Sequence, residues 1–139
     1  MLHVFCDRKG SGKTKFLIDS ANEKVKSSKG HIVYIDDDKR PMFQLDSKIR
    51  FISTEEYGLK DCSHFYGFLC GILSEDYDIT NIYIDGLFNI IEGDIEDAAH
   101  LFYAMEKLSQ KYEVDFHINI NFEKDTIPEF VKKYVAWLN

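Results

Sequence analysis

Apolar residues are distributed along the chain in two kinds of segment that alternate with each other. Short runs rich in apolar and β-branched residues predict strands at 2–6, 31–35, 49–52, 82–84 and 116–120. Apolar residues at three- and four-residue spacing predict helices over 13–27, 61–75 and about 95–108. Because strands and helices alternate from end to end, we expect a three-layer α/β/α sandwich around a mostly parallel sheet.

Two of the expected helices begin at recognisable sequence signals. Asp94 precedes the segment 95–108 and predicts an N-cap. Thr126-Ile127-Pro128-Glu129 has the form of a capping box with proline at the second helical position, and it predicts a last helix to about Leu138. No repeat or Pro/Gly linker interrupts the chain, so we expect a single domain over residues 1–139.

Composition excludes several classes of protein. Apolar residues make up 45% and charged residues 29% of the chain, as in an ordinary globular domain. The longest apolar run, 65–73, is far shorter than the about twenty residues of a transmembrane helix, and the first residues do not form a signal peptide. We therefore expect a cytoplasmic protein without a membrane partner. Three Cys without a C-x-x-C pair and five scattered His predict neither disulfides nor a zinc site.

The charge of the chain is unevenly distributed. Residues 1–30 hold seven Lys or Arg against three Asp or Glu, whereas the net charge of the whole chain is −7. An acidic protein is a poor general binder of nucleic acid, so we expect no nucleic-acid partner. The basic N-terminal segment is where we expect an anion to bind.

The segment Asp7–Thr14, which follows the first predicted strand, has the features of a phosphate-binding loop. Gly12-Lys13-Thr14 matches the end of the Walker A pattern G-x-x-x-x-G-K-[ST]. Glycines let backbone N–H groups approach phosphate oxygens, the lysine ammonium reaches the β and γ oxygens, and the threonine hydroxyl suits Mg²⁺. The predicted nucleotide-binding residues are Lys9, Gly10, Ser11, Gly12, Lys13, Thr14 and Lys15.

Two further observations bear on this loop. Lys13 and Lys15 lie at a helix N-terminus, where cations oppose the helix dipole unless an anion binds there. The first Walker glycine is replaced by Asp7, a carboxylate that would repel a polyphosphate. Phosphate binding remains the prediction, with affinity and hydrolysis rate affected by Asp7.

The strand 82–84 ends at Asp85, where a phosphate-binding loop needs an acid that organises Mg²⁺. We therefore predict Thr14 and Asp85 as metal ligands and Lys13 and Asp85 as catalytic residues. Together these residues resemble the P-loop NTPase superfamily over the whole chain. More narrowly, the chain is similar to small bacterial single-domain P-loop ATP-binding proteins, some labelled after the twitching-motility ATPase. That motor has an added N-terminal domain and further acid and histidine motifs that this sequence lacks.

The resemblance also directs attention to residues beyond the two Walker strands. ATPases with an extra strand between those strands often place Glu after the Walker B aspartate, but here that residue is Gly86. Glu92, Asp94 and Glu96 are other candidate bases, and Asn119 or Asn121 is a candidate sensor of the γ-phosphate. No arginine finger is evident among Arg8, Arg40 and Arg50.

The predicted function is Mg-ATP binding with slow hydrolysis, which would make the protein a nucleoside triphosphatase. ATP is preferred over GTP because no N-K-x-D motif occurs. A small-molecule kinase is an alternative, because Asp36-Asp37-Asp38 ends the second strand and could bind an acceptor hydroxyl. A non-enzymatic nucleotide sensor or partner-binding module, which would not hydrolyse ATP, is another alternative. A minimal nucleotide-binding domain that lacks an arginine finger also suggests that the protein acts as a homo-oligomer or with a protein partner.

Overall fold

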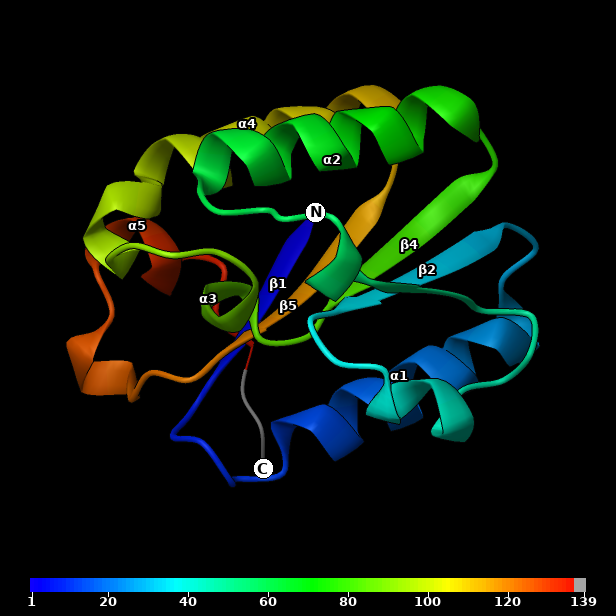
Figure 1. The fold of residues 1–139 in the computed structure, drawn as a ribbon, viewed down its shortest axis with the longest axis horizontal. Helices are drawn as coiled ribbons and strands as arrows, with labels where there is room; N and C mark the ends of the chain where they lie inside the picture. The colour runs from blue at the N-terminus through cyan, green and yellow to red at the C-terminus, as the bar shows by residue number, and fades with distance from the viewer. Residues whose placement is uncertain (137–139) are drawn as a thin grey trace.

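A computed structural model describes residues 1–136 of the chain (Figure 1). Five strands form one sheet in the order β1-β5-β4-β2-β3, and every neighbouring pair is parallel. The strands are β1 (Leu2–Cys6), β2 (His31–Asp36), β3 (Arg50–Ser53), β4 (Ile79–Ile84) and β5 (Asp115–Ile120). All five strands predicted from the sequence are confirmed, with small shifts of their bounds.

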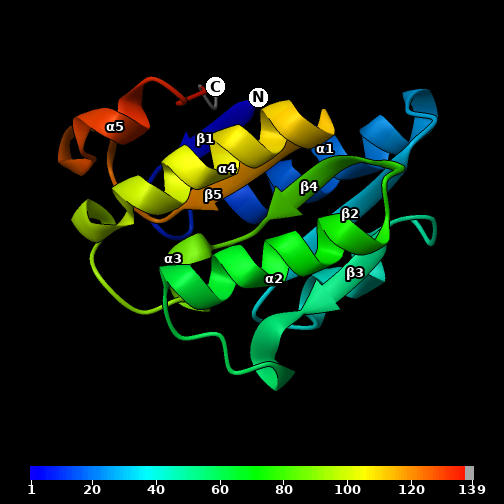
Figure 2. The same ribbon diagram turned by 90° about the horizontal axis from the view of Figure 1, so that it is seen from above.

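Helices cover both faces of the sheet. The helix α1 (Lys13–Ser27) lies on one face, and α2 (Cys62–Glu75) and α4 (Ala99–Tyr112) lie side by side on the other (Figures 1 and 2). Short elements complete the chain: the helices α3 (Leu87–Ile90) and α5 (Glu129–Lys132), and the 3₁₀ turns η1 (Arg40–Gln44), η2 (Thr54–Glu56), η3 (Ile95–Ala98) and η4 (Lys124–Thr126). The α/β class and the parallel sheet are confirmed. No helix of the described chain is long and apolar enough to cross a membrane.

The strands are apolar on both sides because helices bury both faces of the sheet. In β4, Ile82 and Ile84 face the larger core beneath α2 and α4, whereas Tyr83 faces the smaller core beneath α1. All three side chains are fully buried. The sheet is therefore packed against apolar side chains on both faces.

On the α1 face, one ring from each strand stacks against the next to form an aromatic ladder across the sheet. Successive ring centroids are 5.1, 4.2, 6.1 and 6.3 Å apart. The rings belong, in strand order, to His3, His117, Tyr83, Tyr34 and Phe51, which are paired directly by the strand register. Burial lowers the pKa of His117 to about 4, so this imidazole is uncharged at neutral pH and stacks without a charge to solvate. A one-residue slip of any strand would turn its ring to the opposite face.

The prediction of a long last helix is wrong. The helix α5 ends at Lys132, and Val135 instead forms a parallel bridge with Val4 at the open edge of β1. Val4 N donates to Tyr134 O at 2.9 Å, and Ala136 N donates to Val4 O at 2.8 Å. The unpaired backbone groups of an edge strand thus draw the chain out of the helix. Leu138, the predicted end of that helix, lies outside the described residues.

The predicted capping box is also wrong in its details. Thr126 belongs to the turn η4, and its hydroxyl donates to Glu123 O at 2.8 Å instead of accepting from the amide of Glu129. The N-cap of α5 is Pro128. Thr126 is used in a local turn because its hydroxyl finds a nearer backbone acceptor.

Asp94 precedes the expected helix but does not cap it through its side chain. The first turn of that segment is the 3₁₀ turn η3. The backbone carbonyl of Asp94, and not its carboxylate, accepts the amide of Asp97 at 3.0 Å. A short helix, α3, was not predicted, because four residues are too few to show helical periodicity.

The two aspartates before helical segments provide a matched test of capping. The Asp61 carboxylate accepts the amide of His64 at 2.8 Å at the start of α2, whereas Asp94 makes no such bond. We expect Asp61→Ala to lower the free energy of unfolding by about 1 kcal/mol in urea titrations. Asp94→Ala, the control, should change it by less than about half as much. Equal losses in the two variants would contradict this assignment of the caps.

Candidate functional site

A cavity of about 790 Å³ opens at the edge of the sheet where the strands end. One wall is the first turn of α1 and the glycine loop, by which we mean residues 7–12. Residues at and after the end of β2 form a second part of the lining, and residues after the end of β4 form a third. The lining residues are Lys9, Gly10, Gly12, Lys13, Thr14, Asp36, Asp37, Asp38, Arg40, Pro41, Gln44, Asp85, Gly86, Asn89 and Asn121. The cavity therefore brings together the basic segment, the triple acid and the strand-ending Asp85.

The glycine loop turns around the ammonium group of Lys13. Lys13 Nζ lies 2.8 Å from Asp7 O, 2.9 Å from Arg8 O and 3.3 Å from Ser11 Oγ. Gly10 and Gly12 have positive φ angles of 86° and 94°, which residues with a side chain rarely adopt. The lysine is 4% exposed, and burial lowers its pKa. The loop is therefore wound around the Lys13 ammonium group.

Asp85 is the centre of a buried network of hydrogen bonds. Thr14 Oγ1 donates to Asp85 Oδ1 at 3.1 Å, across 71 residues of sequence. Asn119 Nδ2 donates to the same oxygen at 2.7 Å, and the Tyr34 hydroxyl donates to Oδ2 at 2.8 Å. Asn119 also accepts the amide of Gly86 through its side-chain oxygen. These three donors fix the orientation of the carboxylate.

The triple acid 36–38 contributes three carboxyl groups in different environments. Asp36 is only 7% exposed, and its pKa is raised to about 9 by burial first, then by its hydrogen bond with Asp37 and the charge of Asp85. Asp38 forms an ion pair with Arg40 at 2.7 Å, and this partner lowers the pKa of Asp38. At neutral pH the acid wall therefore carries a protonated Asp36 beside an ionised Asp38.

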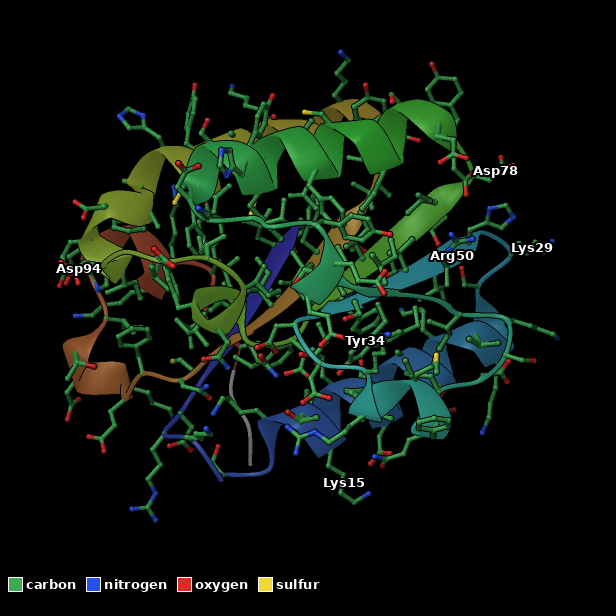
Figure 3. All side chains as sticks on the ribbon, in the orientation of Figure 1. Lys15, Lys29, Tyr34, Arg50, Asp78 and Asp94 are labelled. Carbon is green, nitrogen blue, oxygen red and sulfur yellow. The ribbon has the colours of Figure 1, made fainter. Side chains whose placement is uncertain are left out.

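Not every predicted residue reaches the cavity. Lys15 pairs with Asp19 at 2.9 Å on the outer surface of α1 and points away from the sheet (Figure 3). Ser11 turns its hydroxyl toward Lys13 and does not line the cavity. The carboxylate of Asp7 accepts the amide of Arg8 at 2.8 Å and is also outside the lining. The other predicted residues, Lys9, Gly10, Gly12, Lys13, Thr14 and Asp85, lie together there.

The backbone explains two departures from the Walker pattern. Among the described residues with a side chain, Glu113 alone has a positive φ, so Asp7 sits in a conformation that does not require glycine. Gly86 has a φ of 70°, and a Cβ there would lie 2.8 Å from Asn89 Nδ2. A glutamate at position 86 would therefore be strained in this backbone.

The candidate catalytic bases and the candidate γ-phosphate sensors occupy different places in the structure. Glu92, Asp94 and Glu96 are exposed and do not line the cavity. Asn119 is buried beneath Asp85, and Asn121 lines the cavity. Of the two asparagines, Asn121 is therefore the one that faces the space where a ligand would lie.

Sequence reasoning missed the donor Tyr34 and the wall residue Asn89. Tyr34 lies two residues before Asp36 on the same face of β2, so strand alternation contained a signal that the two share a face. Its contact with Asp85 depends on the pairing of β2 with β4, which no local pattern reveals.

One cluster of metal-ligating groups lies elsewhere. Ligand atoms of His31, Asp76 and Asp78 lie within 4.8 Å of one another. These residues lie where β2 and β4 begin, at the ends of the strands away from the cavity. His31 and Asp78 are exposed, and the imidazole of His31 already pairs with Asp76 at 2.7 Å. This cluster is accounted for as a surface ion pair.

Comparison of the chain with models of known protein families finds no match, and comparison with curated proteins finds no relative. The functional argument therefore depends on the geometry of the cavity.

The raised pKa of Asp36 predicts a pH dependence of stability. In the unfolded chain this carboxyl ionises near its ordinary pKa of 3.8, whereas in the folded chain it keeps its proton to about pH 9. Between these values the folded state binds more protons, so Asp36 lowers stability as the pH rises, by up to about 1.4 kcal/mol per pH unit. We expect Asp36→Asn to be more stable relative to the natural chain at pH 7.5 than at pH 5.5, measured by urea unfolding.

Asp38→Asn is the matched control for this experiment. Its pKa is lowered by Arg40, so Asp38 is ionised in both states across that range and its replacement should leave the pH slope unchanged. A natural chain and an Asp36→Asn variant with the same slope would show that Asp36 is ionised in the folded protein.

Proposed function

We propose that the protein binds Mg-ATP in this cavity and hydrolyses it slowly, as a nucleoside triphosphatase of P-loop type. The observation that carries the proposal is the contact of Thr14 with Asp85 at 3.1 Å, at the foot of a glycine loop wound around Lys13. A hydroxyl and a carboxylate beside a lysine are the groups needed to hold a metal ion and a polyphosphate.

The groups beside Thr14 fit Mg²⁺ in their chemistry. Mg²⁺ prefers oxygen ligands and is usually held by one or two carboxylates together with phosphate oxygens. Thr14 Oγ1 and Asp85 Oδ1 are such ligands, and both residues line the cavity. Bound Mg²⁺ would neutralise charge on the phosphate oxygens.

Strand order also supports this class. The strand β5 lies between β1, which precedes the glycine loop, and β4, which precedes Asp85. This is the arrangement expected of P-loop ATPases with an extra strand between the two Walker strands. Slow turnover is expected because Gly86 offers no carboxylate at the position where those ATPases often carry a glutamate.

The two lysines of the first turn of α1 provide a test with a built-in control. We expect Lys13→Ala to lower the affinity for Mg-ATP at least tenfold, or by about 1.4 kcal/mol, in isothermal titration calorimetry. Lys15→Ala should leave the affinity within twofold, because Lys15 already pairs with Asp19. Thermal melting of both variants checks that they fold.

Two results would refute the proposal. One is absence of heat from the natural chain at millimolar Mg-ATP and millimolar Mg-GTP. The other is equal affinity in the Lys13→Ala variant and the natural chain. Binding without turnover would instead make the protein a nucleotide sensor.

A small-molecule kinase is the second candidate function, favoured by one observation. Asp36, Asp37 and Asp38 line the same cavity as the glycine loop. An acceptor hydroxyl bound there would face the phosphate-binding side. This function predicts that ATP turnover rises when a hydroxyl compound is added and that Asp37→Asn abolishes the rise. A broad screen of sugars, nucleosides and alcohols in which no compound stimulates turnover would rule this function out.

A further inference from the structure

We propose that Tyr34 is a positioning residue that makes the site selective for Mg²⁺ over larger divalent cations, by holding the Asp85 carboxylate in one orientation. The inference rests on the proposed function, because it concerns the cation that accompanies the nucleotide. It assigns a role to a residue that lies outside the Walker patterns and does not line the cavity.

The contact is direct and fully buried. The Tyr34 side chain has no exposed surface, and its hydroxyl lies 2.8 Å from Asp85 Oδ2. The carboxylate oxygens only accept hydrogen bonds, so the Tyr34 hydroxyl is the donor of this pair. Asn119 and Thr14 both donate to Oδ1, so the Tyr34 hydroxyl is the side-chain donor that holds Oδ2 and limits rotation of the carboxylate about Oδ1.

The ring of Tyr34 has little freedom to withdraw this donor. Its centroid lies 6.1 Å from that of Tyr83 and 6.3 Å from that of Phe51, on the two neighbouring strands. Figure 3 shows Tyr34 near the middle of the molecule, between the sheet and α1. The aromatic ladder therefore fixes the ring, the ring fixes the hydroxyl, and the hydroxyl fixes the carboxylate.

A fixed carboxylate matters more to Mg²⁺ than to Ca²⁺. Mg²⁺ requires nearly ideal octahedral geometry at about 2.1 Å, whereas Ca²⁺ accepts six to eight ligands at longer and more variable distances. If the carboxylate can rotate, the cation with the stricter geometry loses more affinity. Groups that orient a metal ligand typically contribute about 10- to 100-fold to metal affinity.

The experiment measures the affinity of a fluorescent ATP analogue in Mg²⁺, in Ca²⁺ and in excess chelator. We expect Tyr34→Phe to reduce the affinity in Mg²⁺ by about tenfold or more, to reduce that in Ca²⁺ much less, and to leave the value in chelator unchanged. The ratio of the Mg²⁺ to the Ca²⁺ affinity should fall at least about fivefold.

Tyr83→Phe is the matched control, because it removes a hydroxyl from the next ring of the same ladder. That hydroxyl lies 3.5 Å from Ser20 and does not touch Asp85. The control should keep the Mg²⁺-to-Ca²⁺ ratio of the natural chain. An equal fall in both variants would assign the effect to the ladder and overturn the role of the Tyr34 hydroxyl.

The remaining outcomes separate this inference from the proposed function. A natural chain that binds the analogue equally in Mg²⁺ and in chelator contradicts the metal site itself. A natural chain that requires Mg²⁺, together with a Tyr34→Phe variant of unchanged ratio, overturns the inference alone. If Tyr34→Phe does not fold, 4-aminophenylalanine and 4-methylphenylalanine at position 34 replace it: both fill the space of the hydroxyl, but the amino group alone donates and should alone retain the natural ratio.

Discussion

The parallel pairing of β1, β5, β4 and β2 sets the position of every group in the cavity. Because these strands run in the same direction, the glycine loop, Asp36, Asp85 and Asn121 all follow strand ends at one edge of the sheet. The same register stacks one ring from each strand on the α1 face. A hydrogen bond such as that between Thr14 and Asp85 is formed only if this register holds.

Electrostatics then divides the cavity. The Lys13 ammonium group donates hydrogen bonds to backbone carbonyl oxygens of the glycine loop. Asp85 accepts hydrogen bonds from Thr14, Asn119 and Tyr34. The pKa of Asp36 is raised, and this carboxyl group keeps its proton, because burial beside Asp37 and Asp85 disfavours a further negative charge. The site thus holds one carboxyl group that three donors orient, at Asp85, and one that keeps its proton nearby, at Asp36.

Most of the fold could be predicted from the sequence, because strands such as 31–35 and helices such as 13–27 follow periodic apolar patterns. Errors arose where contacts distant in sequence outweigh a local pattern. The last helix stops at Lys132 because the edge of β1 offers backbone partners to Tyr134 and Ala136. The cavity residues Lys13, Thr14 and Asp85 could be predicted from motifs, whereas Tyr34 could not, because its partner is set by cross-strand register.

The central claim is that a metal-bound nucleotide lies between the glycine loop and Asp85. A crystal structure with Mg²⁺ and a non-hydrolysable ATP analogue tests it most directly. The account predicts phosphate oxygens against the backbone of Gly10 and Gly12 and a metal ion about 2.1 Å from Thr14 Oγ1. A nucleotide bound elsewhere, or a metal ion that does not contact Thr14 in the complex, would contradict it.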